Sequence, residues 1–113
     1  MPMTVVELDN GVTKVAISGR IDVAGAQEID LPLNVVGGSR RAVVIDLVEV
    51  SFMASMGLRG LVMCAKSIHS KRGKVGMFGP RAEVEEVIRT MGIDELIPLF
   101  ASEAEAIALV TAV

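Results

Sequence analysis

The chain has 113 residues, a formal net charge of −3 and a single cysteine, Cys64. This length fits one domain that buries roughly two thirds of its extended-chain surface. The negative charge argues against a nucleic-acid-binding protein, which usually carries a dominant basic face. One cysteine excludes an internal disulfide and favours a reducing compartment. No apolar run approaches the roughly 18 residues of a membrane span, and the N-terminus lacks the pattern of a signal peptide. We therefore expect a soluble cytoplasmic domain without direct membrane insertion.

The first third of the chain predicts a β-hairpin followed by a helix. Two β-branched runs, at residues 3–8 and 12–18, flank Asn10-Gly11, a pair that tolerates the positive φ angles of a hairpin turn. Asp22 can cap a helix that extends to about residue 37. Its apolar residues recur at helical spacing: Ala26, Ile29, Leu33 and Val36.

Proline and glycine divide the next segment. Pro32 lies within the helical pattern, so we expect a kink or a break there. Gly37-Gly38-Ser39 predicts a loop. The mainly apolar residues at 41–47 predict a strand that is buried on both faces. A second helix is expected from about residue 55 to residue 71.

The last third continues the alternation of strands and helices. Residues 74–79 predict a strand, and Pro80 favours the first turn of a helix that ends at Gly92. A short edge strand at 96–100 contains a proline, and Ser102 and Glu105 form a capping box for a last helix to about residue 112. The third helix would place four apolar residues on one side: Val84, Val87, Ile88 and Met91. The whole pattern predicts an α/β sheet with helices packed on it.

The helix predicted at 55–71 has an unusual outer face. On a helical wheel, one arc about 120° wide carries the residues expected to face the sheet: Leu58, Leu61, Val62, Ala65, Ile68 and His69. The opposite arc contains Met56, Gly60, Met63 and Ser67, edged by Arg59 and Ser70. Methionine is common at protein-binding surfaces, and glycine permits close approach of a partner. This arc is therefore either a binding face or a surface that another helix covers.

No group of residues has the spacing of a catalytic or metal site. Ser55 and His69 lie about 21 Å apart along one helix, too far for a nucleophile and its base. We expect His69 to be a structural histidine and Cys64, which has no activating cation, to be inert. Asp22 is expected to cap a helix, and no local spacing pairs it with Asp46. The sequence therefore predicts a protein that is not an enzyme and needs no cofactor or metal.

Two motifs give the chain a family resemblance. Val-Val-Ile-Asp-Leu at 43–47, followed by Phe-Met-Ala-Ser-Met-Gly-Leu at 52–58, resembles the central signature of the STAS domain of bacterial anti-sigma factor antagonists. Gly-Arg-Ile-Asp at 19–22 resembles the segment that leads into the first helix of that family. Residues 75–80, 88–92 and 102–106 match in order and spacing. The resemblance implies one domain over residues 1–113, with a small mixed β-sheet flanked by about four helices.

The resemblance also implies a binding function with a phosphorylation switch. In that family the domain binds an anti-sigma factor that is also a serine kinase, and phosphorylation at the start of the second helix blocks binding. The family pattern Phe-Met-Asp-Ser-Ser/Thr-Gly places its Asp on Ala54, its first Ser on Ser55 and its phosphoacceptor on Met56. Met56 has no hydroxyl group. Ser55 is then the nearby candidate for modification, although a helix cap is its simpler interpretation.

We therefore expect a regulatory protein that binds an anti-sigma factor or a related ATP-binding regulatory protein. Its partner-binding residues would lie in the 19–22 loop and along the second helix: Arg20, Asp22, Ala54, Ser55, Met56, Gly57, Arg59, Gly60 and Met63. One alternative is a STAS subunit of a membrane transport ATPase, which requires no phosphoacceptor. Another is a small-ligand or nucleotide-binding α/β domain, which requires a polar pocket. The oligomeric state does not follow from the sequence.

Overall fold

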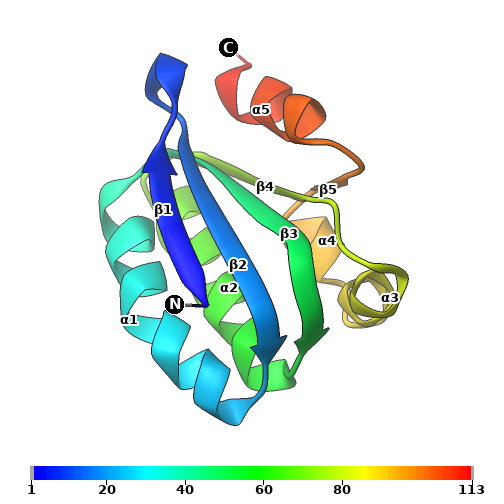
Figure 1. Cartoon of the computed structure of the whole chain (residues 1–113). Helices are drawn as coiled ribbons and strands as arrows, with labels where there is room; N and C mark the ends of the chain where they lie inside the picture. The colour runs from blue at the N-terminus through cyan, green and yellow to red at the C-terminus, as the bar shows by residue number, and fades with distance from the viewer. Residues whose placement is uncertain (1, 113) are drawn as a thin grey trace.

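A mixed five-stranded β-sheet organises the computed structural model, which describes residues 2–112 (Figure 1). The strands lie in the order of the sequence: β1 (Met3–Glu7), β2 (Thr13–Ile21), β3 (Ala42–Met53), β4 (Lys74–Phe78) and β5 (Leu99–Phe100). β1 is antiparallel to β2, and all other neighbours are parallel. The predicted small mixed sheet with an N-terminal hairpin is confirmed.

The helices cover the two faces of this sheet unequally. They are α1 (Val23–Ser39), α2 (Ser55–Ser70), α3 (Ala82–Thr90), α4 (Ile93–Leu96) and α5 (Glu103–Thr111). α1 and α2 each connect adjacent parallel strands, so right-handed crossovers place both on the same face, where they pack against each other (Figure 1). α5 packs on the opposite face, against β3 and β4. None of the helices within residues 2–112 is long and apolar enough to cross a membrane.

The centre of the sheet is buried on both sides, as the run at 41–47 predicts. Val43 and Ile45 belong to the larger hydrophobic core beneath α1 and α2, whereas Val44 belongs to the smaller core beneath α5. All three side chains are fully buried. Alternation along a strand sends successive side chains to opposite faces, so a continuous apolar run is what a doubly covered strand needs.

Two strands extend further than expected and thereby position the site. β2 continues past residue 18 to Ile21, and β3 continues past residue 47 to Met53. Their extensions pair Arg20 with Phe52 and Ile21 with Met53, after two register shifts. Gly19 lies between those shifts with a φ of 85°, a left-handed conformation that glycine adopts without strain.

The predicted loop at residues 37–39 is wrong, because α1 continues to Ser39, and of the kink or break expected at Pro32 the break does not occur. Gly37 is buried against α2, where an added Cβ would lie 3.2 Å from the Cys64 Cα. The Lys71 ammonium donates to the Gly37 carbonyl oxygen, and the Arg40 N–H donates to the Val36 carbonyl oxygen. Packing on α2 and satisfied end carbonyls therefore outweigh the low helix propensity of the two glycines.

The region after β4 also differs from the prediction. α3 begins at Ala82, not at Pro80, and only Val84 and Ile88 of its four expected apolar residues are buried. Gly92 adopts a φ of 71° and reverses the chain into α4, a helix that the sequence did not reveal. α4 includes residue 96, the first residue of the strand expected at 96–100, and Pro98 has no N–H to donate to a hydrogen bond between strands. β5 is therefore only two residues long, at the edge of the sheet. The predicted capping box of Ser102 and Glu105 is confirmed.

Candidate functional site

The candidate site lies at the carboxyl ends of β2 and β3, where α1 and α2 both begin (Figure 1). The Ala54 N–H donates to the Ile21 carbonyl oxygen at 2.8 Å, which joins the two strand ends. Asp22 caps α1 as predicted, because its Oδ1 accepts from the Gly25 N–H at 2.9 Å. Two helix N-termini therefore open toward the same end of the sheet.

The start of α2 has no side-chain cap. Ala54 is the N-cap residue, and an alanine side chain offers no oxygen to the first-turn N–H groups. Ser55 is the first helical residue with an exposed side chain, so its interpretation as the helix cap is wrong. Met56 follows it, half exposed. The first turn thus presents free N–H groups beside an exposed hydroxyl and an exposed thioether.

Gly57 is buried, unlike Ser55 and Met56 before it. An added Cβ would lie 2.6 Å from the Met53 Sδ and 2.9 Å from the Ile21 Cγ2. The glycine lets the first turn of α2 press against the ends of β2 and β3. Its place in the structure therefore supports the geometry of the site and offers no side chain to a partner.

The outer arc of α2 forms one wall of a groove between α1 and α2. Met56 and Met63 are each 50% exposed, and we call these two residues with Gly60 the methionine face. Gly60 lies between them and faces α1, since an added Cβ would lie 3.4 Å from the Leu33 Cδ1. The groove has a volume of about 240 Å³ and is lined by Asp30, Asn34, Met56, Arg59, Gly60 and Met63. α1 therefore flanks the methionine face without covering it.

The α1 wall of this α1–α2 groove was missed by sequence reasoning. Asp30 and Asn34 lie on the α2 side of α1, and a neighbouring hollow of about 230 Å³ adds Ala26 and Gln27 beside Met56. Spacing within one helix cannot show which residues of another helix lie opposite. The sequence does contain one signal for them. Polar residues form a strip along α1, between the apolar residues that face the core and the apolar residues that face outward.

Phe52 is a second addition to the site. Its ring is partly exposed, and the Arg20 guanidinium lies over it, 4.2 Å from the ring centroid. The paired strand register places the two residues side by side. A guanidinium stacked on an aromatic face is held in one orientation by the ring quadrupole. Arg20 and Phe52 form an ordered pair at the same sheet end as α2.

The remaining candidates do not converge on this site. Asp46 accepts from the Val48 N–H and lies 3.7 Å from Lys14, so it does not pair with Asp22. Cys64 is buried, and burial raises the pKa of its thiol to about 11. His69 is exposed at the far end of α2, so the expectation of a structural core histidine is wrong. Within residues 2–112 no three metal-ligating side chains of the His, Cys, Asp or Glu type gather.

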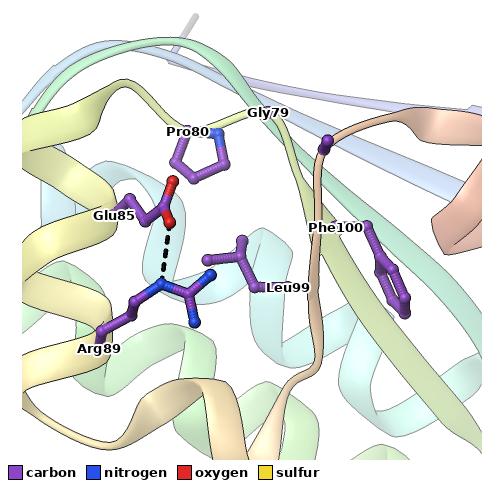
Figure 2. Close-up of a pocket in the computed structure, with 7 residues that line it drawn as sticks. Gly79, Pro80, Glu85, Arg89, Leu99 and Phe100 are labelled. Atoms are coloured by element: carbon purple, nitrogen blue, oxygen red, sulfur yellow. Dashed lines mark hydrogen bonds and ion pairs between the residues drawn. The ribbon is translucent and has the colours of Figure 1, made fainter.

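A separate hollow of about 410 Å³ lies at the carboxyl ends of β4 and β5 (Figure 2). Its one cation is Arg89, whose Nε lies 2.8 Å from the Glu85 Oε2 and whose Nη1 lies 3.2 Å from the Asp94 Oδ2. These carboxylates, Glu85 foremost, raise the pKa of Arg89. Figure 2 shows Glu85 and Arg89 directed at each other, while the Phe100 ring lies across the strand from them. The guanidinium is thus already neutralised and is poorly placed to attract an anionic ligand.

Comparisons with known proteins place this geometry in a family. The STAS domain matches residues 3–106. Anti-sigma-F factor antagonist RsfB of Mycobacterium tuberculosis is 32% identical over 99 residues, which cover 87% of this chain and 80% of the relative. The crystal structure of an anti-sigma factor antagonist from Mycobacterium paratuberculosis has a TM-score of 0.85 at 30% identity, covering 96% of this chain and 92% of that one. The phosphorylated form of SpoIIAA, the Bacillus cell fate determinant, shares the fold, with a TM-score of 0.73 at 17% identity over 96% and 98% of the two chains. The chain therefore belongs to the STAS domain family of anti-sigma factor antagonists.

Proposed function

We propose that this chain binds an anti-sigma factor, or a related ATP-binding regulatory protein, through the first turn of α2 and the methionine face. One observation carries the proposal: Met56 and Met63, each half exposed, flank a glycine on a helix whose first N–H groups have no side-chain cap. The names of its relatives support this class of partner. A regulator of this kind acts in the cytoplasm, which is where we place this chain.

The chemistry of the surface suits a protein partner. Flexible, polarizable methionine side chains adapt to an apolar counterpart, and the α1–α2 groove beside them can receive a side chain from the partner. Arg20 stacked on Phe52 adds an arginine and an aromatic ring, two residue types that dominate binding energy at protein interfaces. Arg59 lines the groove and adds positive charge. We assign Arg20, Asp22, Ala54, Ser55, Met56, Arg59, Gly60 and Met63 to the interface, add Phe52 and give Gly57 a supporting role.

We further propose that the phosphorylation switch of the family is absent from this chain. Met56 occupies the position of the family phosphoacceptor and has no hydroxyl group. Ser55 is exposed, but one residue along a helix turns a side chain by about 100° around the axis. A kinase that aligns position 56 therefore does not align the Ser55 hydroxyl. Without the added charge of a phosphate, the domain stays permanently competent to bind.

Binding can be tested with a pair of matched methionine variants. Met63 and Met91 have nearly equal exposure, 50% and 53%, but Met91 lies at the end of α3, outside the proposed interface. Titration calorimetry with an anti-sigma factor from the same organism would compare Met63→Glu with Met91→Glu. We expect Met63→Glu to weaken binding by about thirtyfold, the loss of one interface anchor, and Met91→Glu to bind as the wild type does. Equal binding by both variants would refute the assigned face.

The switch requires a separate measurement. Intact-mass spectrometry after incubation with the same partner and ATP should show no added phosphate on the wild-type chain. Met56→Ser should be modified only weakly, because Ala54 also lacks the carboxylate of the family pattern. A stoichiometric phosphate on the wild type that disappears in Ser55→Ala would show that the switch has moved by one residue. We also expect no enzymatic activity, and reproducible turnover of an ester or nucleotide, abolished by one point substitution, would overturn this expectation.

A further inference from the structure

The methionines of the described residues fall into a buried group and an exposed group. Those of the buried group belong to the larger hydrophobic core: Met3, Met53 and Met77. Met56 and Met63 are each 50% exposed on the methionine face, and Met91 at the end of α3 is 53% exposed. A dissolved oxidant attacks a thioether that it can reach, so exposure decides which methionines are oxidised first. Two of the three exposed thioethers lie on the proposed partner site.

The one cysteine does not compete for such an oxidant. Cysteine reacts as the thiolate, and a low pKa and exposure make it the faster target. Cys64 is buried in the larger core, and burial raises the pKa of its thiol to about 11. Among the described residues, a dissolved peroxide therefore meets the exposed thioethers before it meets a reactive thiolate.

The hollows beside the methionine face suit the oxidised side chains in the free protein. Gln27 lines the hollow next to Met56, and Asn34 and Arg59 line the α1–α2 groove next to Met56 and Met63. Amide and guanidinium N–H groups can donate to a sulfoxide oxygen. An apolar partner surface would instead bury that oxygen without a donor, which costs free energy. Oxidation thus favours the free protein over the complex.

We propose that Met56 and Met63 form a reversible oxidation site, at which peroxide converts the methionine face to sulfoxides and weakens partner binding. The inference rests on the proposed function, because it requires that a partner covers this face. In the reaction the thioether sulfur attacks one peroxide oxygen, the O–O bond breaks and the other oxygen leaves as water. Sulfur loses the two electrons that the peroxide gains. Methionine sulfoxide reductases return two electrons from thiols and release the added oxygen as water.

This site would give the domain an off-state that does not depend on a kinase. Met56 occupies the position of the family phosphoacceptor, so oxidation adds a polar oxygen where phosphorylation is no longer possible. The state of the face would then follow the level of peroxide. By linkage, a bound partner would also protect both thioethers from oxidation, because the binding and the modification oppose each other.

Peptide mass mapping after brief treatment with hydrogen peroxide tests the site itself. In the free chain, Met56, Met63 and Met91 should each gain one oxygen well before the core methionines do. An anti-sigma factor from the same organism, added before the peroxide, should protect Met56 and Met63 but leave Met91 reactive. Oxidation of Met56 and Met63 at the rate of the core methionines would overturn the proposal, and so would oxidation that a bound partner does not slow.

Titration calorimetry, after catalase has removed the peroxide, tests the effect on binding. Oxidation should weaken binding of the wild-type chain by at least about tenfold, and methionine sulfoxide reductases with dithiothreitol should restore it. Met91→Leu is the matched control and should lose affinity on oxidation as the wild type does. The double variant Met56→Leu/Met63→Leu is compared with itself, and peroxide should leave its affinity unchanged. Circular dichroism should show the treated chain folded, and loss of the folded signal would refute a local effect.

The outcomes separate this proposal from the proposed function. Untreated Met63→Glu that binds as the wild type does would refute the assigned face, and the oxidation proposal would fail with it. If untreated Met63→Glu binds weakly but the oxidised wild type binds as before, the face stands and the oxidation proposal alone is refuted. Equal losses on oxidation in the wild type and in Met56→Leu/Met63→Leu would place the sensitive residue elsewhere and refute it too.

Discussion

Replacing Gly37 with alanine tests whether close packing between α1 and α2 or intrinsic helix propensity has the larger effect on stability at this position. Gly37 lies where α1 comes closest to α2, and an added Cβ would stand 3.2 Å from both the Cα and the carbonyl oxygen of Cys64, and 3.3 Å from the Ser67 Cβ. Ordinary contacts begin at 3.4 Å, so relief requires a shift of a few tenths of an ångström. Two of these atoms belong to the α2 backbone, so the helices themselves must move apart.

The magnitude follows from two opposing effects. Alanine favours a helix over glycine by about 1 kcal/mol, whereas overpacking of this kind costs about 1–3 kcal/mol. Gly37→Ala should therefore leave the free energy of unfolding unchanged or lower it by up to about 2 kcal/mol. Gly38→Ala is the control, because its added Cβ meets no atom within 4 Å. This variant should gain the full propensity, about 1 kcal/mol.

Urea denaturation of both variants, at a concentration too low for association, would measure the difference directly. We expect Gly37→Ala to be less stable than Gly38→Ala by about 1–3 kcal/mol, the packing term alone. Thermal unfolding should separate the two by roughly 4 °C or more. Equal stabilisation by both alanines would mean that the helices are not in close contact at Gly37, and the reasoning would fail.

Three further outcomes are expected. Cys64 should resist maleimide in the native protein and react fully in denaturant, because burial keeps its thiol protonated with a pKa of about 11; labelling is read by intact mass. Ser102→Ala should lower the free energy of unfolding by about 1 kcal/mol through loss of the capping box, measured in urea against Ser51→Ala, since Ser51 is an exposed residue of β3 that caps no helix. Glu103 raises the pKa of Lys14, so this pair stabilises the fold below the unfolded lysine pKa and its contribution disappears as pH rises through the folded value. The stability difference between wild type and Lys14→Met should therefore be below about 1 kcal/mol near neutral pH and should shrink above about pH 10; a constant difference would refute the linkage.

Local signals explain which elements the sequence revealed. Asn10-Gly11 and the Ser102–Glu105 capping box determine backbone geometry within a few residues, and the structure has both features. Gly37 shows the opposite case. Its local propensity predicts a loop, but the neighbouring α2 backbone makes a glycine the residue that fits inside the helix. Only the packed pair of helices contains that information.

The candidate site also combines residues that local sequence signals reveal with residues that only the tertiary packing reveals. The exposure of Met56 and Met63 follows from the helical wheel, because both lie opposite Leu61 and Ala65 on one helix. The contribution of Asp30 depends on how α1 packs beside α2, and the stacking of Arg20 on Phe52 depends on two register shifts in the sheet. Spacing within one segment cannot specify either arrangement. Gly57 was assigned to the interface for its position, whereas its burial shows that the packing of α2 requires it.

The exposed junction between β3 and α2 has a consequence for how such proteins diverge. The side chains of Ser55 and Met56 stand outside both hydrophobic cores, so exchanging them alters few contacts within the fold. Gly57, one residue further, is constrained by Ile21 and Met53. Substitutions at positions 55 and 56 should therefore cost little stability, whereas substitution of the adjacent glycine should disturb the packing of α2 on the sheet. The surface chemistry of this junction can thus change while the architecture is kept.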